Sequence, residues 1–184
     1  MKFKFKIQQY QTDAVENTVA VFTGQPSHRV AEYRRDLGKR SQQQIDFEGE
    51  TGFRNHHIEL DGRTLLKNIN AIQNLYDITP SATLSKGVGA VNLDIEMETG
   101  TGKTYVYIKT MFELNKQYGW SKFIIVVPSI AIREGVGKSF RMLEDHFMEH
   151  YGKKARWFIY DSNRLKNLDD FSSDAGINVM IINM

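Results

Sequence analysis

Apolar and polar positions follow a regular rhythm from residue 91 to residue 182. Short apolar runs, which predict strands, occupy 91–97, 122–127, 156–160 and 177–182. Stretches with apolar residues three or four positions apart, which predict helices, occupy 103–118, 132–150 and about 163–171. Strands that alternate with helices form a parallel sheet covered by helices. The sequence therefore predicts an α/β fold with three layers and a mostly parallel sheet.

Residues 1–90 have a weaker pattern. Phe3, Phe5 and Ile7 alternate with lysines and predict a short strand, and the apolar positions of 8–22 and 64–76 predict two helices. The polar segment 27–63 between these helices is by composition the least structured part of the chain. We therefore divide the chain into an N-terminal extension of helices and loops, residues 1–90, and a sheet domain, residues 91–184.

The segment 98–104 places a glycine turn and a Lys-Thr pair between a predicted strand and a predicted helix, the order of a phosphate-binding loop. The glycines let the backbone curl and direct its N–H groups at phosphate oxygens, and the helix adds the positive end of its dipole. Lys103 would reach the β and γ phosphates, and the Thr104 hydroxyl would hold Mg²⁺. The predicted binding residues are Glu98, Thr99, Gly100, Thr101, Gly102, Lys103 and Thr104. The strict pattern has glycine where Met97 stands, so a tight turn without a ligand is the alternative.

Two further segments contain candidate binding residues. Gln11 begins a predicted helix, and its side-chain amide can pair with both the donor and the acceptor of the adenine edge, so it could select ATP. A polar helix start is the alternative interpretation. The strand 122–127 ends in Pro128 and Ser129, and Arg133 follows in the next helix. A hydroxyl and backbone amides at this edge of a sheet suit contacts with a nucleic-acid backbone, although an ordinary strand-to-helix turn has the same pattern.

Taken together, these segments resemble the first motor domain of superfamily-two helicases and translocases, a RecA-like P-loop NTPase domain. Residues 95–107, 112–116 and 122–136 look most like the restriction (Res) subunit of type III restriction-modification enzymes, and the resemblance extends from about Ile7 to the end of the chain. Methionine is common in that family at the position of Met97.

The resemblance implies ATP and Mg²⁺ as cofactors and ATP-driven movement on double-stranded DNA. It also implies a modification (Mod) methyltransferase subunit as partner and a nuclease domain far downstream. The strand with the Asp-Glu pair that binds Mg²⁺ and activates water is expected after residue 184, because Asp169-Asp170 does not follow a buried strand. The second motor domain is expected there too. We therefore expect an N-terminal motor segment that binds nucleotide without turnover and has no complete catalytic set.

The composition excludes some classes of protein and of binding site. The net charge is +2 and gives no argument for nucleic acid by itself. The chain has no cysteine, which excludes disulfides and thiolate metal sites. No apolar run approaches the roughly 20 residues that span a bilayer, and the first residues lack the apolar core of a signal peptide. A cytoplasmic protein with no membrane partner is expected.

Two alternative functions remain. A nucleotide-binding regulatory module that never meets DNA would have the same loop. His146, Glu149 and His150 match the H-x-x-E-H pattern of inverted zinc proteases, but the buried positions of this predicted helix place the two histidines on its flank.

The basic residues of 29–40 could contact DNA phosphates, although neighbouring acids favour a solvated face. His56-His57 is interpreted as a solvated loop.

Overall fold

The computed structural model describes residues 5–28, 31–34, 51–87, 89, 91–163 and 166–184. The chain divides into two compact units. The first contains the residues up to Ser27 together with His57–Tyr118, and the second contains His28–His56 and Gly119–Met184. Each unit is therefore built from two separate segments of the sequence.

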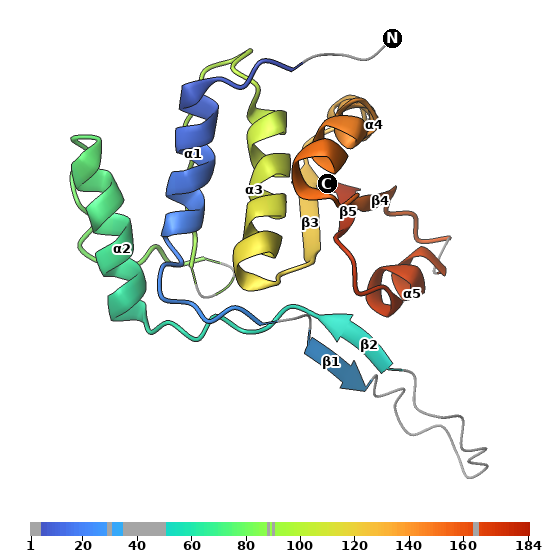
Figure 1. Cartoon of the computed structure of the whole chain (residues 1–184), viewed down its shortest axis with the longest axis horizontal. Coiled ribbons are helices and arrows are strands. Elements are labelled where there is room, and N and C mark those ends of the chain that lie inside the picture. The colour runs from blue at the N-terminus through green and yellow to red at the C-terminus, as the bar shows by residue number, and fades with distance from the viewer. Residues whose placement is uncertain (1–4, 29–30, 35–50, 88, 90, 164–165) are drawn as a thin grey trace. The chain divides into compact units, whose positions relative to one another are not determined.

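The first unit is helical. It contains α1 (Gln9–Ala20), α2 (Gly62–Leu75) and α3 (Lys103–Tyr118), and α1 runs alongside α3 (Figure 1). The apolar face of α1 includes Val15 and Val19, which are 1% and 2% exposed. The Tyr118 hydroxyl donates to the Val19 carbonyl at 3.2 Å, which ties the end of α3 to α1. The Asn68 amide of α2 donates to two carbonyls just after α1, so the three helices form one body.

The second unit contains a parallel sheet. Strands β3 (Lys122–Val127), β5 (Asn178–Asn183) and β4 (Arg156–Ile159) lie in the order β3-β5-β4. Helix α4 (Ile130–Tyr151) packs its Gly137 against the Trp157 ring, where an added Cβ would come within 2.9 Å. Helix α5 (Lys166–Ser173) packs Phe171 edge-on against Phe158. Because neighbouring residues of a strand point to opposite faces, α4 and α5 cover opposite faces of the sheet.

An antiparallel hairpin also belongs to the second unit. Its strands are β1 (Ala31–Arg34) and β2 (Thr51–Arg54), and Ala31 pairs with Arg54. Asn55, directly after β2, holds the start of β3. Its Oδ1 accepts from the N–H groups of Ser121 and Lys122 at 2.7 and 2.9 Å, and its Nδ2 donates to the Lys122 carbonyl at 2.8 Å. One side chain thus takes the place of a neighbouring peptide group.

The predicted α/β class, with its parallel strands and its helices, is confirmed, but two local predictions differ. Residues 91–97 do not form a strand, because no neighbouring strand among the described residues supplies the hydrogen bonds of a ladder. The N-terminal strand is also absent over residues 5–7, while Phe3 lies outside the described residues. The polar segment 27–63 contains the hairpin strands, so part of it is ordered.

Candidate functional site

The segment 98–102 forms a tight turn that leads directly into α3, which begins at Lys103. Gly100 and Gly102 have φ angles of +83° and +87°, a left-handed conformation that residues with a Cβ rarely adopt. Thr101 closes the turn, because its hydroxyl donates to the Glu98 carbonyl at 2.6 Å. The backbone of this turn therefore requires both glycines.

Lys103 folds back into the turn. Its ammonium donates to the carbonyl oxygens of Met97 and Glu98, each at 2.8 Å. These neutral acceptors hold the positive charge inside the loop, at the N-terminal end of α3, where the helix dipole is also positive. An anion with several oxygens could replace the two carbonyls and satisfy the same ammonium. The arrangement is therefore compatible with the binding of an anion.

Gln11 reaches this turn from α1. Its Nε2 donates to the Thr101 carbonyl at 2.8 Å, which identifies the end of the amide that carries the hydrogens. A Cβ on Gly102 would lie 2.5 Å from that nitrogen, so Gly102 is needed for close packing as well as for its φ angle. The nitrogen has a second hydrogen, and the amide oxygen is an acceptor. Contact with the loop is therefore compatible with contact to a base.

Tyr10 makes a contact that sequence reasoning missed. Its hydroxyl donates to the same Thr101 carbonyl at 3.1 Å. The two residues are 91 positions apart, and no motif at either position indicates the pairing. Only the packing of α1 beside α3 brings them together.

The remaining residues of the predicted loop lie in the turn and at the start of α3, although the strand predicted before them is absent. Glu98 and Thr99 are exposed in the turn, and Thr104 lies in the first turn of α3. The Thr104 hydroxyl is hydrogen-bonded to Tyr107; burial raises the pKa of Tyr107, and this hydrogen bond partly offsets the rise. The structure thus gathers Gln11 and all the predicted loop residues within the first unit.

A cleft of about 740 Å³ adjoins the turn in the first unit. One face of α1, part of α2 and residues 92–98 line it, and its charged lining residues are Asp13, Asp94, Glu96 and Glu98. Carboxylates repel phosphate, so a triphosphate would bind at the N–H groups of the turn and not deep in this cleft. The glycine turn therefore lies beside an acidic cleft.

Pro128, Ser129 and Arg133 belong to the second unit. Ser129 is the N-cap of α4, and its hydroxyl oxygen accepts from the Ile132 N–H at 3.3 Å. The Arg133 guanidinium donates to Asn183 Oδ1 at 2.7 Å and pairs with Glu134 at 3.2 Å, and its side chain is 21% exposed. Pro128 is exposed at the end of β3. Arg133 is thus held against the end of β5.

The histidine pattern on α4 provides two imidazoles. The rings of His146 and His150 lie 4.3 Å apart, and His150 Nδ1 is 2.8 Å from the His146 carbonyl. Phe147 between them is buried, and Glu149 is exposed. In the part of the chain that the structure describes, no third metal-ligating side chain gathers with this pair. The geometry does not complete a zinc site of the predicted kind.

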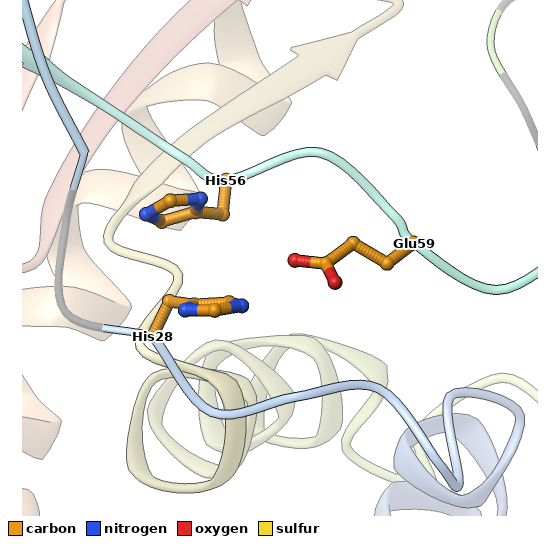
Figure 2. A group of neighbouring side chains, drawn as sticks. All are labelled: His28, His56 and Glu59. Carbon is orange, nitrogen blue, oxygen red and sulfur yellow. The ribbon is translucent and has the colours of Figure 1, made fainter.

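A second histidine pair was not predicted. His28 precedes β1 and His56 follows β2, and their rings stack at 4.4 Å with an interplanar angle of 29° (Figure 2). Glu59, also drawn in Figure 2, belongs to the first unit, where its N–H donates to Gln25 Oε1 at 2.8 Å. The hairpin explains the histidine stack, because antiparallel pairing brings the residues before β1 and after β2 together.

The sequence of this chain is similar to those of known proteins. The chain matches the family model "Type III restriction enzyme, res subunit" over residues 4–183. The Res subunit of the type III restriction-modification enzyme EcoP15I from Escherichia coli is 36% identical over 112 residues, 60% of this chain and 11% of that protein. The EcoPI Res subunit of Escherichia phage P1 has the same identity and coverage. The StyLTI Res subunit of Salmonella typhimurium strain LT2 is 40% identical over 89 residues, 46% of this chain and 8% of that protein.

None of the helices that the structure describes combines the length and apolar character needed to span a bilayer.

Proposed function

We propose that this chain, which belongs to the type III restriction enzyme Res-subunit family, binds ATP with Mg²⁺ at residues 98–104. Lys103 would contact the β and γ phosphates, the N–H groups of the turn would surround them, and Thr104 would hold Mg²⁺. Gln11 would read the adenine edge. The observation that carries the proposal is the position of the Lys103 ammonium, held by two carbonyls inside a turn with two left-handed glycines.

We also propose a role for the protein to which this segment corresponds. Residues 91–184 would be the first half of a RecA-like motor domain, and 1–90 its N-terminal extension. The relatives are Res subunits of restriction-modification enzymes, so we propose ATP-driven movement on double-stranded DNA, DNA cleavage and a Mod subunit as partner. Pro128, Ser129 and Arg133 would contact the DNA backbone. The matched region is 11% of the E. coli protein, so other parts would contribute to these activities.

Lys103→Ala tests the nucleotide site. The variant loses the only side-chain cation of 98–104, so ATP affinity measured by isothermal titration calorimetry should fall about 10-fold to 100-fold. Lys67→Ala is the matched control, because Lys67 is an exposed lysine of α2 in the same unit. Equal ATP affinity in the two variants would remove the assignment of 98–104 as the phosphate site.

A nucleotide-binding regulatory module without DNA activity is the second candidate. The bond between Arg133 and Asn183 favours it, because it engages a cation proposed for DNA. Binding of a fluorescent DNA duplex at several salt concentrations separates the two. Under the motor proposal Arg133→Ala weakens binding and lowers its salt dependence. Absence of duplex binding by the wild-type chain at low salt would favour the regulatory module.

A further inference from the structure

Two donors from α1 hold a single carbonyl of the phosphate-binding turn. The Gln11 amide and the Tyr10 hydroxyl both donate to the Thr101 oxygen, at 2.8 and 3.1 Å. Tyr10 belongs to no phosphate-binding pattern, and its side chain is 48% exposed, so burial in the core does not explain its position.

The direction of this carbonyl matters for anion binding. The peptide group between Thr101 and Gly102 is planar and trans, so its C=O and N–H point in opposite directions. A carbonyl drawn toward α1 therefore turns the Gly102 N–H away from α1, into the turn that Lys103 also enters. Thr101 lies between two glycines in the left-handed conformation, and glycine has many accessible conformations. Contacts from outside the turn therefore help to fix this peptide.

We propose that Tyr10 is a positioning residue of the phosphate site. Its hydroxyl orients the Thr101–Gly102 peptide and so prepares the Gly102 N–H for a phosphate oxygen; this rests on the proposed function of 98–104. Gln11 differs, because its amide also has a second hydrogen and an oxygen for a base. Tyr10 would act on phosphate affinity alone, whereas Gln11 would act on both phosphate affinity and base selection.

Tyr10→Phe removes only the hydroxyl. Affinities for ATP, GTP and inorganic tripolyphosphate, each with Mg²⁺, are measured by calorimetry on the 184-residue chain. The loss of one neutral hydrogen bond should weaken all three by a common factor of about 2-fold to 10-fold. Tyr76→Phe is the matched control, because Tyr76 is 46% exposed in the same unit, directly follows α2 and is not one of the two donors to the Thr101 carbonyl. Without ligand, the melting temperature of Tyr10→Phe should be slightly lower than that of Tyr76→Phe, because Tyr10→Phe loses one hydrogen bond of the folded state.

The outcomes separate this inference from the proposed function. If wild-type protein binds neither ATP nor tripolyphosphate, the nucleotide site and the role of Tyr10 both fall. If wild-type protein binds and Tyr10→Phe matches Tyr76→Phe, only the role of Tyr10 is overturned. If Tyr10→Phe weakens ATP but leaves tripolyphosphate unchanged, Tyr10 contacts the base and does not position the loop.

Discussion

Gly102 is the position where the packing of α1 against the turn 98–102 can be tested most directly. Its φ angle is +87°, and a Cβ added to it would lie 2.5 Å from Gln11 Nε2. Gly100 has nearly the same conformation, with a φ angle of +83°, but a Cβ added to it would have no neighbouring atom within 4 Å. Alanine at the two positions therefore meets the same backbone strain and different neighbours.

The expected losses follow from these geometries. A left-handed conformation costs an L-residue about 1–2 kcal/mol, so Gly100→Ala should lower the free energy of unfolding by that amount. Gly102→Ala has the same cost and also displaces the Gln11 amide. That amide is the end of a flexible side chain, so it moves away and loses its bond to Thr101, about 0.5–1.5 kcal/mol. The expected total for Gly102→Ala is about 1.5–3.5 kcal/mol.

Urea denaturation followed by far-UV circular dichroism is the suitable measurement. Both tryptophans, Trp120 and Trp157, belong to the second unit, whereas α1, α2 and α3 belong to the first. Tryptophan fluorescence would therefore report on the wrong unit. In a Gln11→Ala background the excess loss of Gly102→Ala over Gly100→Ala should disappear. Equal losses for the two glycine variants in the wild-type background would refute the contact between Gln11 and the turn.

Three other predictions concern base selection, packing and pH. Gln11→Ala should lower the ratio of ATP to GTP affinity measured by calorimetry, and an equal loss for both nucleotides would limit Gln11 to its contact with the loop. Gly137→Ala should destabilise the second unit by about 1–3 kcal/mol in urea denaturation followed by tryptophan fluorescence, because its Cβ would crowd Trp157. Gly135→Ala on the same helix has open space and should stabilise by about 0.5–1 kcal/mol, so similar effects at both positions would contradict the packing of α4. Burial lowers the pKa of Lys122 from 10.5 to about 8, so the folded state loses this proton at a lower pH than the unfolded state does. The destabilisation caused by the buried charge therefore decreases as the pH rises from 8 to 10.5. The free energy of unfolding of Lys122→Met relative to wild type should therefore be greatest at pH 7 and smaller at pH 10, and a pH-independent difference would exclude this titration.

Features with a local physical cause could be predicted from the sequence. The helices α1, α2, α3 and α4 follow from apolar residues at helical spacing, which each segment displays by itself. The glycine turn before α3 follows from two glycines and the start of an amphipathic stretch. The strands β3, β4 and β5 follow from short, strongly apolar runs.

Features that depend on distant neighbours could not be predicted. Residues 91–97 alternate like a strand, but a strand also needs a partner for its backbone groups, and the periodicity does not supply one. The hairpin strands β1 and β2 lie in a polar segment, so no apolar pattern marks them. Gln11 was predicted to read adenine, and its bond to the Thr101 carbonyl was not predicted, because that bond depends on how α1 packs beside α3. The bond from the Tyr10 hydroxyl to the same carbonyl depends on the same packing, so it could not be predicted either.

Asn55 attaches the hairpin to the sheet by a pattern of one acceptor and one donor that an amide provides at every pH. Aspartate has the same shape, but its ionised carboxylate would place an oxygen against the Lys122 carbonyl, and only the protonated form could donate there. Asn55→Asp would therefore convert a permanent attachment into one that tightens on acidification and loosens near neutrality. Replacing the amide nitrogen of Asn55 by oxygen would thus make the attachment of the hairpin to the sheet depend on pH.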